Sequence, residues 1–361
     1  MPHLHRRSAA VALALALAVT ACSGSDDAGS GGTTTAATPS DVTTYLAEIA
    51  DEAIIPAYQG LAEEVATLGG AVDALCAEPS AEHLAAAQDA WKPTVEAWQV
   101  ARPGNLGPAM DSRLMSAVGF EVRPKSIEKL LASDDPVDVE GLDSEGASVR
   151  GLNSAEVVLF GEQRDELTGP DGARRCTYLA STVALVDDAV GEVVEAWTGG
   201  YRDTFVAGID GDPMASVATV MNQTTHRLQE LDERGLRDLV GVDDYDDLKG
   251  ARQDGPAAYG LAARKALLRG VQGLIGTEGH RLVGLVADRS PDTATRLAAA
   301  ATAAGTAFEP LPDSVRVAFD DHQPELSTAA EAVAALKVLV STESASQLGV
   351  TITFSDSDGD G

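Results

Sequence analysis

The segment Arg150-Gly-Leu-Asn-Ser-Ala-Glu-Val-Val-Leu-Phe-Gly161 is a short amphipathic run near the middle of a chain of 361 residues. Within it Asn153 and Glu156 are three positions apart. On a helix, both side chains would therefore project from one face, with Cβ atoms about 5 to 6 Å apart. This spacing allows two ligands of one ion, and it equally suits a buried hydrogen-bonded pair. If the protein has a polar site, it is expected here.

The residue types in this segment restrict the ion that it could bind. A catalytic zinc site uses three protein ligands, usually with at least one imidazole or thiolate. Two side-chain oxygens instead favour a harder cation. The hydrolase motifs His-Glu-x-x-His, Gly-x-Ser-x-Gly and Cys-x-x-Cys are all absent from the sequence.

The composition predicts an all-α protein. Hydrophobic residues make up 44% of the chain and aromatic residues only 4%, with abundant alanine and short valine runs. Helices are predicted from Ser80 as N-cap to Pro103, from 173 to 197, from Asp212-Pro213 onward and from 256 to 275. Gly69-Gly70 predicts a break. Gly199-Gly200 is the predicted boundary between an N-terminal bundle, residues 41–199, and a C-terminal bundle, residues 200–361.

The N-terminus has the features of an export signal. A basic start at Arg6-Arg7 precedes an apolar run, which predicts a signal peptide over residues 1–21. Val19-Thr-Ala-Cys22 resembles a bacterial lipobox, so Cys22 is the predicted lipidation site, and residues 22–40 form a predicted flexible tether. The chain is therefore expected outside the cytoplasm, anchored to the cell membrane. The alternative is a simple signal peptide cut at another position.

The chain is strongly acidic. It has 26 basic and 56 acidic residues, which give a formal net charge of −30. This charge repels phosphate backbones and anionic headgroups, so nucleic-acid binding is not expected. Cations would be attracted at low salt, although dense surface carboxylates also serve solubility alone.

Two further cysteines, Cys76 and Cys176, remain if Cys22 is lipidated. In an exported protein they are predicted to form a disulfide that closes a loop of about 100 residues, worth up to about 4.7 kcal/mol in the loop-entropy model. The alternative is two unrelated buried thiols.

The central segment resembles the signature of the imelysin family, Gly-x-His-x-x-Glu followed by an apolar run and glycine. The resemblance covers nearly the whole mature chain, and it includes further segments: Ala90-Trp91, Glu96-Ala-Trp98, Leu106-Gly-Pro108, Met110-Asp-Ser112, Arg174-Arg175 and the tail from Leu348 to Asp360. It assigns motif or structural roles to the following residues: Gly151, Arg150, Asp111, Gly107 and Pro108. The motif histidine is Asn153 here, and the tryptophan after Asp-Ser is Arg113.

The resemblance implies an all-α fold of two four-helix-type bundles packed side by side, with the motif near their interface. It also implies an exported protein linked to iron uptake, and for some members a metallopeptidase activity. Glu156 would then be the catalytic residue, and Glu156 with Asn153 would hold a divalent or ferric ion. Because Asn153 replaces the imidazole, both a transition-metal ligand and a proton carrier are lost.

Three functional hypotheses follow. The first is a lipid-anchored binding or accessory protein that works with envelope metal-uptake proteins, without peptidase activity. The second is a metal-dependent endopeptidase in which Glu156 activates water and further ligands, such as Asp111, come from elsewhere in the chain. The third is an envelope scaffold that binds another protein through its helical surface.

Overall fold

Proline and hydroxyl residues set the ends of several helices in the computed structural model, which describes residues 39–170 and 172–353. Ser80 accepts a hydrogen bond of 3.1 Å from the backbone N–H of His83 and begins α3 (Ala81–Ala101), which ends before Pro103. Asp212 caps α11 (Pro213–Gln229) in the same way. These predicted helix ends are confirmed, and the signal peptide and Cys22 lie outside the described residues.

Pro56 explains a widened helical turn near the start of the described chain. Helix α1 (Pro39–Ile49) passes through a π-helical turn, Ala50–Ile54, into α2 (Ile55–Ala77). Pro56 has no N–H to donate to the carbonyl four residues earlier, and a π-turn accommodates the interruption. Helix α2 then runs unbroken through Gly69 and Gly70, so the predicted break there is wrong.

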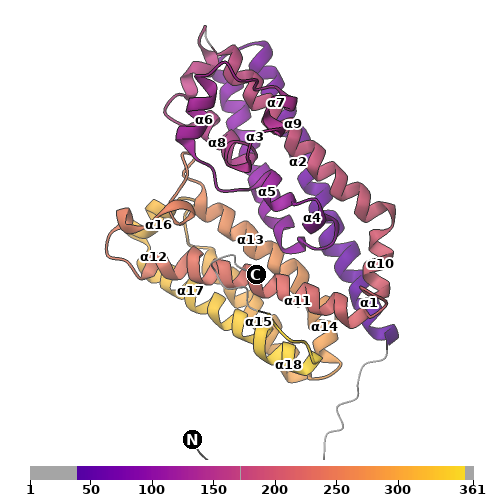
Figure 1. Ribbon diagram of the computed structural model, residues 1–361. Helices are drawn as coiled ribbons and strands as arrows, with labels where there is room; N and C mark the ends of the chain where they lie inside the picture. Colours follow the sequence, from indigo (N-terminus) through magenta and orange to yellow (C-terminus); the bar gives the residue numbers. More distant parts are fainter. Residues whose placement is uncertain (1–38, 171, 354–361) are drawn as a thin grey trace, which may run out of the picture. The chain divides into compact units, whose positions relative to one another are not determined.

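A first group of helices packs around α2, α3 and α9 (Ala173–Ala196), with α8 (Leu152–Phe160) against α3 and α9 (Figure 1). Trp91 and Trp98 of α3 are each only 3% exposed in this core. The shorter helices of this region are α4 (Pro108–Asp111), α5 (Leu114–Val118), α6 (Pro124–Leu131) and α7 (Val139–Asp143). Helix α10 (Arg202–Ala207) packs against α1 and α11.

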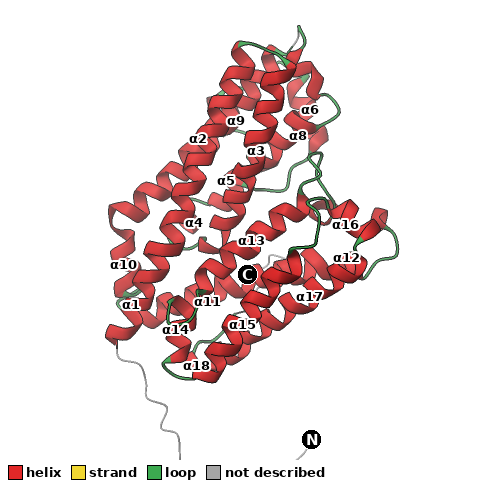
Figure 2. Ribbon diagram, turned by 180° about the vertical axis from the view of Figure 1, so that it is seen from behind, coloured by secondary structure: helices red, strands yellow, loops and turns green. Residues whose placement is uncertain are grey.

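A second group packs around α11, α13 (Gly260–Ile275), α15 (Pro291–Phe308) and α17 (Gln323–Val338). Helix α1 also packs here, against α11 and α14. The remaining helices are α12 (Asp238–Val240), α14 (Arg281–Ala287), α16 (Val315–Asp321) and α18 (Ala345–Leu348). Residues 39–170 and 172–353 contain helices and no strand, which confirms the predicted all-α class (Figure 2). None of these helices is long and apolar enough to cross a membrane.

The two groups meet mainly where α13 packs along α3. The 3₁₀ turn Arg102–Gly104, which follows α3, contacts both α11 and α13. A further contact joins the loop before α13 to α8, because the backbone N–H of Ala257 donates a hydrogen bond to Glu156. Helix α13 begins only at Gly260, so the helix predicted from Pro256 starts too early. The residues from 253 to 259 form instead the turn that meets the motif.

Candidate functional site

The motif residues Asn153 and Glu156 lie on helix α8, and close packing fixes the start of this helix. Its N-cap residue Gly151 has a φ of +90°, and a Cβ there would lie 2.7 Å from the carbonyl oxygen of Val118. A side chain at this position would therefore be strained and would clash with backbone. Leu152, Ala155 and Val158 fill the core, which leaves Asn153 and Glu156 half-buried on the other side of the helix.

Asn153 binds the segment that follows α5. Its amide Nδ2 donates to the carbonyl oxygen of Phe120 at 2.9 Å and, at a longer 3.4 Å, to that of Gly119. Both acceptors are backbone groups that no helix satisfies, so the amide supplies them with a donor. Asn153 thus connects α8 to another part of its own bundle.

Glu156 binds the other bundle. Its Oε1 accepts a hydrogen bond of 3.1 Å from the backbone N–H of Ala257, a residue 101 positions away in sequence. A Cβ at Gly255 would lie only 2.2 Å from the same oxygen, so the loop can approach this closely only because residue 255 is glycine. Glu156 thus joins α8 to the loop that precedes α13.

The environment of Glu156 favours its neutral form. Burial raises the pKa of the carboxyl group to about 7; the Ala257 N–H opposes the rise, and the negative charge of Asp254 adds to it. Glu156 therefore exchanges a proton near neutral pH, unlike an ordinary surface glutamate.

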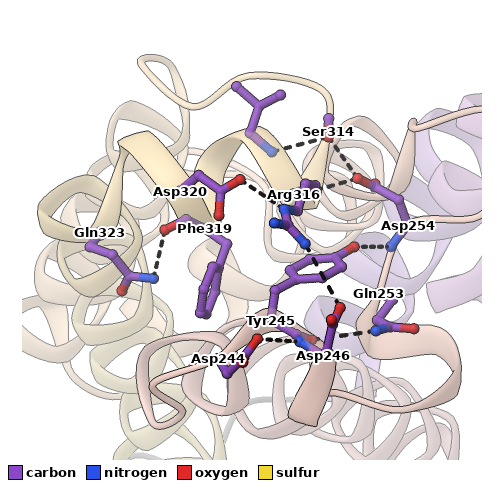
Figure 3. Close-up of polar contacts among 11 residues, drawn as sticks. Asp244, Tyr245, Asp246, Gln253, Asp254, Ser314, Arg316, Phe319, Asp320 and Gln323 are labelled. Atoms are coloured by element: carbon purple, nitrogen blue, oxygen red, sulfur yellow. Dashed lines mark hydrogen bonds and ion pairs between the residues drawn. The ribbon is translucent and has the colours of Figure 1, made fainter.

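Asp254 holds the loop that Glu156 contacts. Its Oδ1 accepts from the backbone N–H groups of Gly260 at 3.0 Å and Val315 at 2.9 Å, at the starts of α13 and α16. Its Oδ2 accepts from the hydroxyl group of Ser314 at 2.6 Å and from the N–H of Arg316 at 2.9 Å. Figure 3 shows Ser314 and Arg316 at the Asp254 carboxylate. A carboxylate at two helix N-termini is electrostatically favourable and fixes both helix starts relative to the loop.

Tyr245, which precedes Asp254 in the same segment, also supports the loop. In Figure 3 the N–H of Asp254 meets the Tyr245 oxygen, at 2.8 Å, and the guanidinium group of Arg316 lies 4.7 Å from the centre of the Tyr245 ring. Arg316 also bonds to Asp320 at 2.7 Å. These contacts pack the 244–254 segment against α16.

Tyr259 and Glu96 form a second connection between the bundles. The Tyr259 hydroxyl group donates to Oε1 of Glu96, and Arg269 of α13 donates to Oε2 at 2.5 Å. Trp91 lies edge-on to Tyr259 and donates from its indole nitrogen to the carbonyl oxygen of Leu152 at 2.9 Å. Asp254, Tyr259 and Arg269 were not predicted as site residues from the sequence, in which the turn signal Asp254-Gly-Pro256 is the local indication of this loop.

The other predicted motif residues lie apart from this junction. Arg150 pairs with Asp143 at 2.8 Å. Gly107 is the N-cap of α4 and Pro108 its first residue, next to the Tyr201 ring. Asp111 is exposed at the end of α4, near enough for its charge to help raise the pKa of Tyr201, for which burial is the larger cause.

Cys76 of α2 and Cys176 of α9 are joined by a disulfide, with their Cα atoms 5.4 Å apart. The bond crosslinks two long helices of the first bundle across a sequence separation of 100 residues. It lies within that bundle and does not connect the two groups of helices.

The motif residues do not fit the metal centre of a peptidase. The Asn153 amide nitrogen is bound to carbonyl groups and Glu156 to a backbone N–H, and these partners lie in different loops. Among the residues that the structure describes, no group of three His, Cys, Asp or Glu side chains could hold one metal ion. A metal-activated water at this pair would have neither an imidazole nor a thiolate ligand beside it.

Comparison with known proteins gives structural relatives. The fold is similar to that of an imelysin-like protein from Psychrobacter arcticum 273-4, with a TM-score of 0.72 and 18% identity, over 88% of this chain and 98% of that chain. It is also similar to a "putative iron-regulated protein A precursor" from Parabacteroides distasonis ATCC 8503, with a TM-score of 0.74 and 18% identity, over 88% and 97%.

These structures confirm the predicted imelysin-like fold of helical bundles packed side by side. No match was found among curated proteins. The imelysin family matches residues 54–342, which include helices α2 to α17 and the motif of α8. The chain therefore belongs to the imelysin family.

Proposed function

We propose that this imelysin-family protein is a binding or accessory protein for metal uptake in the cell envelope, with iron as the metal. In this proposal it does not hydrolyse peptides. In this proposal the protein is exported, Cys22 is its lipid anchor in the membrane, and its partners are envelope metal-uptake proteins. The observation that carries the absence of peptidase activity is that Asn153 and Glu156 bind the backbone of two different loops. Asn153 thereby ties α8 to its own bundle, and Glu156 ties it to the other bundle.

The link to iron has separate support. One protein of similar fold carries the name of a putative iron-regulated protein A precursor. The net charge of −30 also favours the approach of cations at low ionic strength.

Two assays on the purified full chain test the proposal. Titration with ferrous ions and with ferric citrate should give saturable binding, seen as heat and as a rise in Tm. Hydrolysis of an unstructured peptide should stay at the buffer rate with or without added Zn²⁺. If neither form of iron changes heat or Tm, iron binding is refuted, and a scaffold role replaces it.

The second candidate function is a metal-dependent endopeptidase, and one observation favours it. A carboxyl group with a pKa of about 7 is suited to general acid–base catalysis at neutral pH. In that case peptide hydrolysis would be measurable, and both a chelator and Glu156→Ala would abolish it. Asn153→His, which restores the family's imidazole, is the matched variant: it should add metal affinity only if the remaining ligands of a centre are present.

A further inference from the structure

A pocket separate from the motif lies between α2 and α3, with a volume of about 390 Å³. It exists because the facing side chains are small: Ala57 and Gly60 line it on α2, and Pro93 on α3. A Cβ at Gly60 would meet no atom within 4 Å, so the space beside the helix is open at this point. The polar lining residues are Glu64, Glu96 and Tyr259.

The two carboxylates of the pocket differ in their partners. Glu96 is bound by the Tyr259 hydroxyl group and by Arg269, which balances its charge. The half-buried Glu64 carboxylate forms no hydrogen bond or ion pair with any residue that the structure describes; only its backbone carbonyl has a partner, the hydroxyl group of Thr94 at 3.0 Å. The pocket therefore carries one negative charge that no neighbouring cation neutralises.

The walls restrict what can neutralise this charge. The proline ring and the alanine side chain are apolar surfaces suited to methylene groups, while the charged end of a ligand would meet Glu64. A metal ion would need several ligands, and the described residues offer no group of three His, Cys, Asp or Glu side chains that could hold one. A compact ammonium group on an alkyl chain satisfies both the apolar wall and the carboxylate.

We propose that this pocket binds a primary ammonium group on a short aliphatic chain, the chemistry of a lysine side chain or of a free alkylamine. The ammonium group donates to the Glu64 carboxylate, and the methylene groups lie against Pro93 and Ala57. Because Tyr259 belongs to the second bundle and the other wall residues to the first, the ligand contacts both bundles at once. This inference does not depend on the role proposed for iron.

The test uses N-acetyl-lysine-methylamide as probe and N-acetyl-norleucine-methylamide as its uncharged counterpart, with the full chain in low salt. Calorimetry should show saturable binding of the lysine compound and none of the norleucine compound. Glu64→Gln should weaken binding about tenfold or more, because a charge-assisted hydrogen bond is lost. Glu63→Gln is the matched control: Glu63 is the exposed neighbour on the same helix, and its loss should leave affinity unchanged.

A second variant tests the cavity itself. Gly60→Leu places a side chain in open space and replaces a helix-interior glycine, so the chain should fold and binding should be abolished. Butylamine and a lysine-containing peptide then distinguish the sources: equal affinity indicates a free amine, and tighter binding of the peptide indicates a protein partner. Equal binding of lysine and norleucine compounds, or unchanged affinity in Glu64→Gln, would overturn the proposal.

Discussion

Two glutamates join the same two bundles, and their environments shift their pKa values in opposite directions. Glu156 of α8 meets only a backbone N–H, and burial raises its pKa to about 7. Glu230, which follows α11, is also desolvated, but the charges of Arg102 and Arg227 outweigh that effect and lower its pKa to about 2. Arg102 reaches both Glu230 oxygens, at 2.8 and 2.9 Å, and Arg227 binds Oε2 at 2.7 Å.

The difference shows that partners, and not burial alone, decide whether an interface carboxyl group is charged at neutral pH. Glu230 is a permanent anion that neutralises two arginines, of which Arg227 is only 6% exposed. Glu156 is an exchangeable proton site at the family motif. The same interface therefore contains one junction that is insensitive to physiological pH and one that responds to it.

The largest effect is expected from Glu230→Gln. The substitution leaves the positive charges of Arg102 and Arg227 buried without an anion, which should cost about 3 to 5 kcal/mol of unfolding free energy. Urea denaturation at pH 7 measures it. The control is Glu233→Gln on the next turn, which removes a 3.5 Å contact with Lys337 and should cost less than about 1 kcal/mol. An equal loss of unfolding free energy in both variants would contradict the role of Glu230 as the anion that neutralises two buried arginines.

Glu156→Gln should have a smaller, pH-dependent effect. The folded-state pKa of Glu156 is raised, so its stabilising contribution is complete below the unfolded value and is lost as pH rises through about 7. Glutamine keeps an acceptor for Ala257 and cannot ionise. The variant should match the wild type at pH 4, below the unfolded-state pKa, and exceed it at pH 8.5 by about 1 to 3 kcal/mol. Thermal unfolding across this range measures the difference, and a constant difference would exclude a titrating Glu156.

Asn153→Ala should have the smallest effect. It removes one good hydrogen bond, to the Phe120 carbonyl, and should cost about 1 kcal/mol at every pH between 5 and 8.5. Its independence of pH is the contrast with Glu156. A loss that grows with pH would mean that the two motif residues act as one titrating unit.

Local signals in the sequence were sufficient for much of the fold. Ser80, Pro103 and Asp212 act on their immediate neighbours, so their effect on helix ends could be predicted. Gly69-Gly70 was misread because packing between α2 and its neighbours overrides the low helix propensity of glycine. The sequence cannot distinguish the two outcomes without the tertiary contacts.

The candidate site could be only half predicted. The spacing of Asn153 and Glu156 placed both on one helix, but their partners depend on contacts far away in sequence. Ala257 binds Glu156 through its backbone N–H, so its side chain gives no sequence signal for this contact. Glu230 likewise forms its ion pair with Arg102, which is 128 residues away in sequence. Such pairings are set by how the bundles dock.

The most direct test is a titration of the Glu156 carboxyl carbon by NMR, assigned by its absence in Glu156→Gln, with and without Zn²⁺. If Glu156 is a junction residue, its pKa should be about 7 and should not change when Zn²⁺ is added. A metal ligand would behave differently, because a bound cation lowers the pKa of a carboxyl group. A pKa near the ordinary glutamate value, or one that falls when Zn²⁺ is added, would contradict the role assigned to Glu156.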